Sequence, residues 1–393
     1  MRFLFVDTDY PGFLQWLYDQ RAGLERLSYD EQMKTRMDSL FGFADFYSMN
    51  LRKIGHEGWV IHFNNLSMQR AWAEEHGLRL RPTRAPPLRR APWLGQALDE
   101  GPRFAKEALS VGVSAVRQAR TRNQLQMILA AQVRHYTPDV LLVQAMDGID
   151  GRFIRKLRAN AKLLVGQIAS DIPAGLDFAG YDLVLSSLPN IVRNFRSRGI
   201  PSELSRLGFE PSVLRKLGTP GNQVPVSFVG SLWSGYQERI RLLEQLCDRV
   251  GLEIWGSGLD GLRPNSKIQA HHRGPAWGIE MYRVLLRSRI TVNQHREAAG
   301  DHANNMRLFE ATGVGALLVT DFKADLHEVF EAGEEVVAFR SPEECANLVQ
   351  YYLRHEDERK AIAQAGQQRT LRDHTYERRV KELAEIVERH LHR

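Results

Sequence analysis

The residue types best suited to chemistry lie in residues 292–321, where a polar loop opens a short helical pattern. Asn304 or Asn305 stands where that helix needs an N-cap. Arg307 and Glu310 follow, three residues apart and therefore on one face of the helix. Near the positive end of a helix, a guanidinium can hold a diphosphate and a carboxylate can accept both hydroxyls of a ribose. On spacing alone, an Arg–Glu pair on a solvated face explains the pattern better than a ligand site.

Glycine-bearing loops follow two earlier runs that have the pattern of strands. In the first loop, VGSLWSG at residues 229–235, Gly230 and Ser231 precede a long helical pattern, and backbone N–H groups of such a loop favour a phosphate. A structural turn explains this loop equally well. The second loop, GSGLDG at residues 256–261, matches G-x-G-x-x-G, but the LRP that follows breaks a helix instead of starting one. A dinucleotide site is therefore not supported, and Gly256 is interpreted as a strand-end turn that lines a ligand cleft.

Two further polar side chains follow predicted strands. His295 comes directly after Ile290–Asn293, in the same polar loop, and we assign it to the same ligand site. Asp171 follows Leu164–Ile168 and is a candidate acceptor contact or base, with a helix or turn cap as the alternative. In open parallel sheets, ligands bind outside the carboxyl ends of the strands, so these positions are where chemistry is expected.

Short apolar, β-branched runs alternate with helical patterns along the chain, which is typical of parallel sheets covered by helices on both faces. They fall into two series separated by the polar stretch at residues 208–225. The sequence therefore predicts an α/β fold with two doubly wound domains. The predicted strands are Phe3–Val6, Trp59–Phe63, Val140–Gln144, Lys162–Ile168 and Tyr181–Ser186 in the first series, and Val226–Val229, Leu252–Trp255, Ile290–Asn293, Ala316–Thr320 and Val336–Ala338 in the second. The predicted helices are Asp45–Ile54, Asn123–Tyr136, Phe153–Ala159, Leu188–Arg198, Tyr236–Val250, Gly278–Arg287, Asn305–Thr312, Asp325–Phe330 and Pro342–His355.

Length and composition narrow the class of protein. A chain of 393 residues exceeds one ordinary core, so two domains of roughly 150–200 residues are expected. No apolar run of about 18 residues occurs, and the first apolar run meets Asp7 after four residues, so neither a transmembrane helix nor a signal peptide is predicted. Cys247 and Cys345 lie in helical patterns that suit packed thiols, which excludes a disulfide scaffold and a thiolate metal site. We expect a cytoplasmic protein.

Positive charge concentrates in residues 79–122, where ten basic residues stand against three acidic ones. Such a segment can meet an anionic membrane surface, a phosphate-bearing acceptor or nucleic acid, and a solvated insertion is the simplest explanation. Nucleic acid is not expected, because no base-reading motif accompanies the charge. The prolines of Pro82–Pro102 exclude a regular element there, and a helix is expected by Phe104–Arg120. Peripheral membrane contact through this insertion stays a hypothesis.

Residues 290–383 resemble the C-terminal domain of the CgeB-like, or spore-maturation-protein-like, glycosyltransferases, a group itself similar to the retaining GT-4 enzymes. The words that carry the resemblance are NMRLFEATGVGALLVTD, LHEVFEAGEEVVAF, SPEECANLVQYYL and RDHTYERRVKEL. In the first half, LRKIGHEGWVIHFNN resembles the helix–Gly-His–strand unit of GT-B first domains, and RLGFEPSVL resembles their interdomain crossing. The resemblance implies the GT-B fold, two Rossmann-like domains facing across a cleft. Residues 1–208 would be the acceptor domain, with the basic insertion, residues 209–375 the nucleotide-sugar donor domain, and residues 376–393 a helix packing back toward the first domain.

The resemblance also implies roles for individual residues. Glu310 falls on the glutamate that holds the donor ribose in GT-4 enzymes. Asn305 and Arg307 match the group's Asn-Met-Arg word and would face the diphosphate or the sugar. Gly230 and Ser231 occupy the loop that cradles the donor phosphates.

Two positions depart from the GT-4 pattern. His302, beside Asp301, stands where the pattern has an acidic residue eight positions before the glutamate. The basic pair after the first strand of the second domain is missing, and Arg239 is the best substitute. Arg307, Arg239 and Asp171 complete the predicted catalytic set.

The function that the resemblance implies is transfer of a sugar from a nucleotide-diphosphate donor, most simply a UDP-sugar. The acceptor, a glycan, a protein or a small molecule, is not identified. Retention of configuration is implied, without metal or other cofactor, with arginines and backbone N–H groups stabilising the leaving diphosphate. Two alternatives stay open: a non-catalytic sugar-nucleotide-binding protein of the same fold, and a GT-B-type sugar-nucleotide epimerase.

Overall fold

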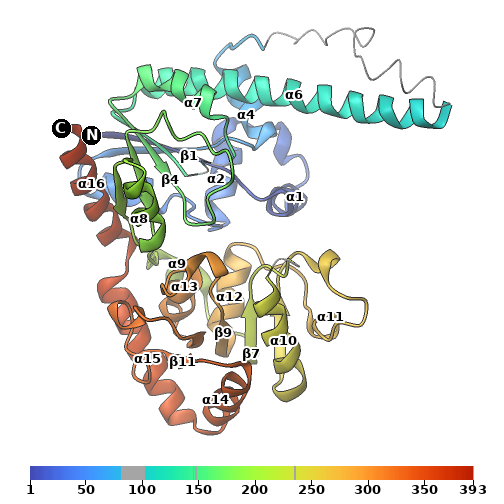
Figure 1. Ribbon diagram of the computed structural model, residues 1–393, viewed down its shortest axis with the longest axis vertical. Helices are drawn as coiled ribbons and strands as arrows, with labels where there is room; N and C mark the ends of the chain where they lie inside the picture. Colours follow the sequence, from blue (N-terminus) through green and yellow to red (C-terminus); the bar gives the residue numbers. More distant parts are fainter. Residues whose placement is uncertain (81–101, 145, 147, 234–235, 393) are drawn as a thin grey trace.

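Two parallel β-sheets covered by helices form two domains, one above the other in Figure 1. The computed structural model describes residues 1–80, 102–144, 146, 148–233 and 236–392. The first sheet has the strand order β2-β1-β3-β4-β5-β6 and the second the order β11-β10-β9-β7-β8. Neighbouring strands run parallel in both sheets. The predicted α/β fold with two doubly wound domains is confirmed.

The first sheet forms where the sequence predicts it, because its inner strands are short apolar runs buried on both faces. The pattern does not predict the edge strand β6 or the helices α1, α2 and α4. In α2 the reason is clear, since the helix buries the polar side chains of Gln32 and Arg36 and so has no apolar stripe. The strands are β1 (Arg2–Asp7), β2 (Glu57–His62), β3 (Val140–Val143), β4 (Leu163–Gln167), β5 (Leu183–Ser186) and β6 (Ser202–Leu204), and the helices are α1 (Pro11–Asp19), α2 (Tyr29–Asp38), α3 (Phe46–Lys53), α4 (Leu66–Glu75), α6 (Pro102–Tyr136), α7 (Gly151–Leu157) and α8 (Pro189–Ser197).

All five strands of the second sheet lie where the pattern predicts them. The helix predicted at Asp325–Phe330 is wrong, because only a single 3-10 turn, Leu326–Glu328, forms there. The short α9 (Ser212–Leu217) joins the domains. The strands are β7 (Val224–Val229), β8 (Leu252–Trp255), β9 (Ser288–Asn293), β10 (Leu317–Asp321) and β11 (Val337–Phe339), and the helices are α10 (Gln237–Arg249), α11 (Ile268–His271), α12 (Ile279–Arg287), α13 (Met306–Gly313), α14 (Pro342–Arg354), α15 (Glu356–Asp373) and α16 (Tyr376–Leu391).

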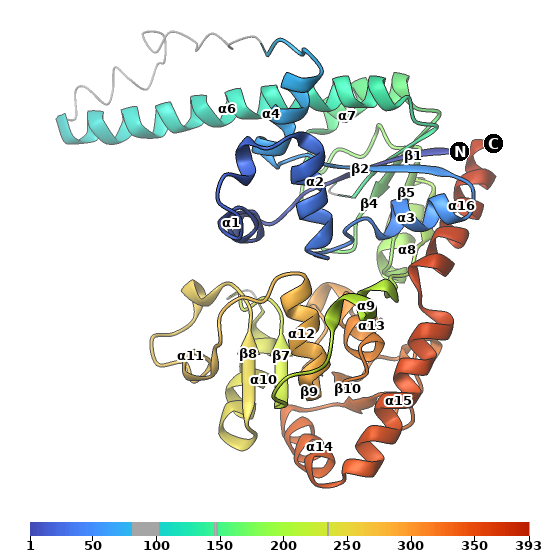
Figure 2. The same ribbon diagram turned by 180° about the vertical axis from the view of Figure 1, so that it is seen from behind.

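The helix α6 is a single element of 35 residues, where the sequence predicts two separate helical stretches. At 1.5 Å per residue it is about 50 Å long. Figures 1 and 2 show its amino-terminal half extending beyond the sheet. Its other half packs on the domain through a buried stripe at helical spacing, formed by Leu125, Ile128, Leu129 and Val133. The proline-rich part of the basic segment, residues 81–101, lies outside the described residues.

Neither a disulfide nor a membrane span occurs in the part of the chain that the structure describes. Cys247 on α10 and Cys345 on α14 are free and buried. Burial raises the pKa of the Cys247 thiol to about 12, so it behaves as a packed apolar group. No helix within the described ranges has both the length and the apolar character that crossing a bilayer requires.

The chain crosses between the domains twice, and the two crossings are bonded side by side. The backbone N–H of Phe209 donates to the carbonyl of His374 at 2.7 Å, and that of Tyr376 donates to the carbonyl of Phe209 at 3.0 Å. Arg379, which is buried, adds a bond from Nε to the carbonyl of Leu207 at 2.9 Å. Beyond the second crossing, α16 packs on α3 and β4 of the first domain.

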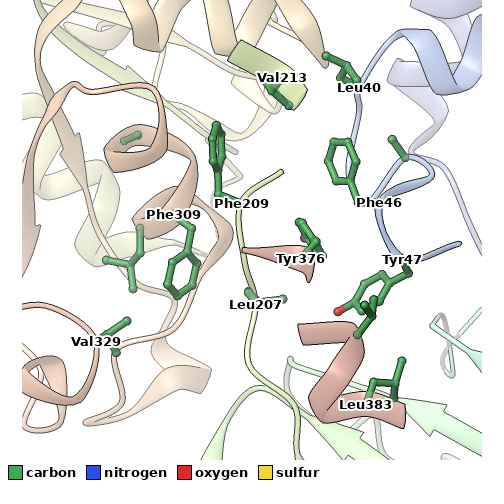
Figure 3. Packing of buried hydrophobic residues seen from close by; sticks show 14 of the residues in the cluster. Leu40, Phe46, Tyr47, Leu207, Phe209, Val213, Phe309, Val329, Tyr376 and Leu383 are labelled. Atoms are coloured by element: carbon green, nitrogen blue, oxygen red, sulfur yellow. The ribbon is translucent and has the colours of Figure 1, made fainter. Parts of the chain in front are cut away.

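One hydrophobic cluster fills the joint between the domains, as Figure 3 shows. The ring of Tyr376 lies 5.1 Å from that of Tyr47 and 5.2 Å from that of Phe46, between centroids. Phe209 from the first crossing and Phe309 from α13 belong to the same cluster. The relative position of the domains is therefore fixed by side-chain packing as well as by backbone bonds.

A substitution at Gly313, at the end of α13, tests how tightly this joint is packed. A Cβ at this position would lie 2.5 Å from the ring of Phe209, which is 1% exposed and has no room to move. We expect Gly313→Ala to lower the free energy of unfolding by about 1–3 kcal/mol, measured by urea denaturation. Gly221→Ala is the control, because nothing lies within 4 Å of a Cβ there. Equal stability of the two variants would contradict the tight packing of the joint.

Candidate functional site

The loops after β7 and β8 touch each other through the two predicted glycines. The backbone N–H of Gly230 donates to the carbonyl of Trp255 at 2.9 Å. A Cβ on Gly256 would lie 1.9 Å from the carbonyl oxygen of Gly230, so only glycine fits there. The carbonyl oxygen of Gly256 in turn lies 2.8 Å from His272 Nε2. The two glycines therefore shape one surface at the carboxyl ends of neighbouring strands.

Arg239 ties the loops after β7 and β9 together. It lies in the first turn of α10, and its side chain folds back into the protein. Its Nη1 donates to the carbonyl of Ser231 at 3.0 Å, and its Nη2 to the carbonyl of Gln294 at 2.9 Å. The guanidinium also lies 4.7 Å from the centre of the Tyr236 ring. Burial lowers the pKa of Arg239, although an arginine stays charged at any physiological pH.

The two asparagines before α13 have different partners. Asn305 is the N-cap, because its Oδ1 accepts from the N–H of Leu308 at 3.1 Å. Its Nδ2 donates to Asn293 Oδ1 at 2.9 Å, so both ends of the amide are used inside the second domain. Asn304 instead reaches the first domain, where its Nδ2 donates to Ser187 Oγ at 2.6 Å. Asn304 therefore stands at the interdomain boundary.

Arg307 and Glu310 form an ion pair, with Nη1 of the arginine 2.8 Å from Oε2 of the glutamate. Nε of Arg307 donates to the carbonyl of Val229, the last residue of β7, at 3.2 Å. The side chains are only 14% and 6% exposed, so the pair does not lie on the solvated face that spacing alone favours. Burial raises the pKa of Glu310, against the opposing effect of Arg307. A buried carboxylate and its cation thus lie beside the end of β7.

His295 is held by an aspartate from the neighbouring strand. Its Nδ1 lies 2.6 Å from Asp321 Oδ1, and its backbone N–H donates to the same oxygen at 2.9 Å. Lys323 Nζ lies 3.3 Å from the other carboxylate oxygen. Burial opposes ionisation of Asp321, but the hydrogen bonds from His295 outweigh it and hold the pKa of this carboxyl below its usual range. Asp321 therefore orients His295, a role that the sequence pattern does not assign.

Buried polar atoms without a protein partner gather at the same place. Nε of Arg239, Oε1 of Gln294 and Nε2 of His295 are buried and make no hydrogen bond to the described residues. Other buried atoms of this kind lie elsewhere in the described residues, as at Gln132 and Tyr181, but at the strand ends three of them occur together, where a ligand or a water molecule can complete the bonding. The ends of β7 and β9 thus offer the Arg239 donor, the Gln294 acceptor and a ring nitrogen of His295 beside the Arg307–Glu310 pair.

A third guanidinium, which the sequence analysis does not select, joins Arg239 and Arg307. Arg296 lies 5.5 Å from the centre of the Tyr236 ring, the same ring that Arg239 covers. The charges of Arg296 and Arg307 both contribute to the lowered pKa of Arg239, whose main cause is burial. The position directly after His295 is the one signal that could have identified Arg296. Three cations near two strand ends suit an anionic ligand.

The first domain contributes fewer of the predicted residues. Asp171 is exposed in the loop after β4, and no hydrogen bond or ion pair among the described residues joins it to the second-domain candidates. A cavity of about 630 Å³ opens beside the next part of that loop. Arg122 of α6 and Arg152 of α7 line it, together with residues 173–177.

His302, which stands where an acidic residue is expected, bridges the domains. Its Nδ1 lies 2.7 Å from Asp325 Oδ2, and its Nε2 lies 3.1 Å from Nη2 of Arg193 on α8. Asp301 beside it is exposed. The position therefore takes part in a contact between domains.

Further contacts hold the domains at opposite edges of the first sheet. Near β6, Nδ2 of Asn190 donates to the carbonyl of Ala298 at 3.0 Å. Near β2, the N–H of Ile279 donates to the carbonyl of Ser39 at 2.7 Å. Ala298 belongs to the loop after β9 that also carries His295, and Ile279 begins α12 (Ile279–Arg287).

A second cavity, of about 740 Å³, lies between α8 and β6 of the first domain and α15 and α16. Many of its arginines are neutralised locally, as in the pair between Arg196 and Glu203 at 3.0 Å. None of the predicted site residues lines it. The strand ends, with their unpartnered polar atoms, are therefore the better candidate site.

Comparison with known proteins bears on the fold and on the kind of domain that carries these residues. Residues 238–385 match a family model described as "Glycosyl transferase-like". HepE from Anabaena, solved with UDP and glucose, has a similar structure at 12% identity and a TM-score of 0.57, over 99% of both chains. A glycosyltransferase from Rickettsia africae is similar at 13% identity and a TM-score of 0.55, over 99% of this chain and 98% of that one. No curated protein sequence matches significantly. The second domain is glycosyltransferase-like and the whole chain has the GT-B fold, whereas the narrower CgeB-like resemblance stays a prediction.

The buried pair of Arg307 and Glu310 makes stability depend on pH in a defined way. In Arg307→Met the carboxylate loses its cation, so the pKa of Glu310, already raised by burial, rises further above its unfolded value. The loss of folding free energy is absent at a pH where Glu310 is protonated in both the folded and the unfolded protein. It is complete at a pH above the pKa of Glu310 in the folded protein. We therefore expect a loss of about 3 kcal/mol at pH 8 and a smaller loss at pH 5, measured by urea denaturation.

Two controls accompany this measurement. Adding Glu310→Gln to Arg307→Met should recover most of the stability at pH 8, because no charge is then buried. Arg241→Met, which removes the partner of the exposed Glu238, should change stability by less than about 0.5 kcal/mol. An equal loss for Arg307→Met at both pH values would show that the carboxylate is not buried as described.

Proposed function

We propose that the protein is a glycosyltransferase that moves a sugar from a nucleotide-diphosphate donor to an acceptor on the first domain. The observation that carries this proposal is the group of buried polar atoms without a protein partner at the ends of β7 and β9. They lie among three guanidiniums, from Arg239, Arg296 and Arg307. This arrangement fits a ligand that combines a diphosphate with sugar hydroxyls.

The chemistry of the reaction explains why cations are needed there. As the bond between the sugar and the phosphate breaks, negative charge develops on the leaving diphosphate. Arg307, Arg239 and the backbone of the Gly230–Ser231 loop meet that charge in the proposed complex. Glu310 accepts the ribose hydroxyls in the same complex. Each member of the Arg307–Glu310 ion pair thereby exchanges its present partner for a group of the donor. His295, Asn304, Asn305 and Gly256 complete the donor site.

A UDP-sugar is the proposed donor, because HepE, which shares the fold over nearly the full length of both chains, is solved with UDP and with UDP-glucose.

We also propose retention of configuration and catalysis that needs no metal, on the resemblance of the α13 segment to retaining enzymes. In this scheme Asp171 contacts the acceptor. The anomeric configuration of the product, read by NMR, tests retention, and turnover in EDTA tests the absence of a metal requirement.

Arg307 is the residue whose loss should affect turnover most. We expect Arg307→Ala to lower kcat by about two to three orders of magnitude, because a charge that meets the leaving group is worth that much in a site shielded from water. The rate of UDP release from a UDP-sugar measures it, at a pH where circular dichroism shows the variant folded. Arg241→Ala, on the exposed face of α10, is the matched control and should keep the wild-type rate. Unchanged turnover in folded Arg307→Ala would remove the assigned role.

Nucleotide binding can be measured without any acceptor. We expect UDP to raise the melting temperature more than GDP or ADP, because only the preferred base adds contacts beyond the shared diphosphate. Arg239→Met should weaken UDP binding at least about tenfold in calorimetry, because it releases the loops at Ser231 and Gln294. Arg241→Met serves again as the control. A wild-type protein that none of the three nucleotides stabilises would contradict the donor site.

One observation favours a second candidate, a protein of this fold that binds sugar nucleotides without turnover. Arg239 already donates to two carbonyls, and Arg307 to one carbonyl and one carboxylate. Cations used in this way suit binding as well as catalysis. UDP binding of normal affinity with no release of UDP from any UDP-, GDP- or ADP-sugar would select this candidate.

A further inference from the structure

Aromatic side chains meet where the loop between β1 and α1 reaches the second domain. Phe13 and Phe41 stack with their centroids 4.0 Å apart. Trp277, which comes from the second domain, packs against Phe41 at 5.3 Å in an edge-on arrangement. Tyr10 lies beside this group, 5.9 Å from Phe41 and 6.3 Å from Trp277. Tyr10 is therefore placed at the interdomain boundary.

Tyr10 is 67% exposed, and the loop that carries it is firmly anchored. The N–H of Asp9 donates to Asn64 Oδ1 at 2.8 Å, and its carbonyl accepts from Asn64 Nδ2 at 2.7 Å. The carboxylate of Asp9 pairs with Arg36 at 2.6 Å, and both side chains are buried. Pro11 begins α1 directly after Tyr10. Because the loop is already ordered, an exposed ring on it loses little entropy when a ligand binds.

Asp7, a half-buried residue, lies three residues before Tyr10. Asp7 ends β1, and within the described residues its side chain receives one hydrogen bond, from the N–H of Thr8 at 2.8 Å, and enters no ion pair. Arg36, whose charge acts on Asp7, is paired with Asp9 instead. Asp7 thus keeps acceptor capacity at the carboxyl end of its strand, where ligands of parallel sheets bind.

We infer that the acceptor is a saccharide, with its ring lying on Tyr10 and a hydroxyl donating to Asp7. This inference rests on the proposed function and narrows its acceptor to one chemical class. A sugar ring has a face of C–H groups that packs on an aromatic ring, and hydroxyls that donate to carboxylates. A phosphate-bearing acceptor fits less well, because Asp7 and Asp9 bring two negative charges and Arg36 balances one of them.

The charges around Asp7 give the contact a pH dependence. Burial raises the pKa of Asp7 to about 6, with Arg36 on α2 opposing the rise and Asp9 adding to it. His62, opposite Asp7 on β2, is neutral above acid pH, because burial lowers its pKa to about 3. Asp7 is therefore the group that changes charge near pH 6. Below that pH its carboxyl is protonated and accepts a sugar hydroxyl less well, so acceptor binding weakens.

A glycan array incubated with the full chain, with and without UDP, provides the first test. We expect the protein to be retained on neutral saccharides. With a retained saccharide as acceptor, Tyr10→Ala should raise the acceptor KM about tenfold, and Tyr10→Phe should restore most of the affinity. Asp7→Asn should raise the acceptor KM and abolish its further rise below pH 6. Tyr351→Ala is the control, because this ring is 39% exposed on α14 of the other domain.

The outcomes separate the inference from the proposed function. The inference is overturned if the array retains the protein on no saccharide, or if Tyr10→Ala leaves the acceptor KM unchanged. This holds even if the wild type binds UDP and releases it from a UDP-sugar. A protein that is retained on saccharides but binds no nucleotide keeps the sugar contact and removes the proposed transfer. Equal pH profiles of KM for the wild type and Asp7→Asn remove Asp7 from the contact.

Discussion

The hydrogen-bonded crossing of Phe209 and Tyr376 sets the position of every other functional element. It is reinforced by Glu210, which is buried and accepts from Nδ2 of Asn50 at 2.7 Å and from the N–H of Ser212 at 3.0 Å. Because the same hydrophobic cluster serves both domains, rotation about this joint would disturb two cores at once. Contacts at the edges add to this joint. Trp277 packs on Phe41 close to Ile279 in the chain, and Arg193, on the same helix as Asn190, reaches His302.

The candidate donor site is arranged by residues whose main partners are other parts of the protein. Arg239 fixes the carbonyls of two loops, Asn305 caps α13, and Asp321 orients His295. Each of these contacts holds a ligand-facing group before any ligand arrives, which lowers the entropic cost of binding. The site consequently depends on the ends of four strands, β7 to β10, and on the helices α10 and α13. A single substitution at a supporting position is therefore expected to act on several contacts.

The sequence predicts the strands well, because buried parallel strands are short apolar runs whatever surrounds them. It also narrows the N-cap of α13 to two asparagines, because local chemistry decides a cap. The inward turn of the Arg239 side chain and the meeting of Trp277 with Phe41 cannot be predicted in this way, because their partners lie far away in the sequence. Burial of the Arg307–Glu310 pair is a similar case, since the spacing of three residues is the same on an exposed face. The helix α2 is also missed by its sequence pattern, because the side chains that it buries are partly polar and find their partners elsewhere in the fold.

The return of α16 to the first domain has a consequence for synthesis. The buried side chains Val380, Leu383 and Val387 are part of the core that also contains β1, yet they are translated after the whole second domain. The first domain therefore leaves the ribosome with apolar surface uncovered, and this surface stays uncovered until α16 emerges. Chaperone occupancy of nascent chains should accordingly persist past the second domain, and the two domains should reach their final packing together.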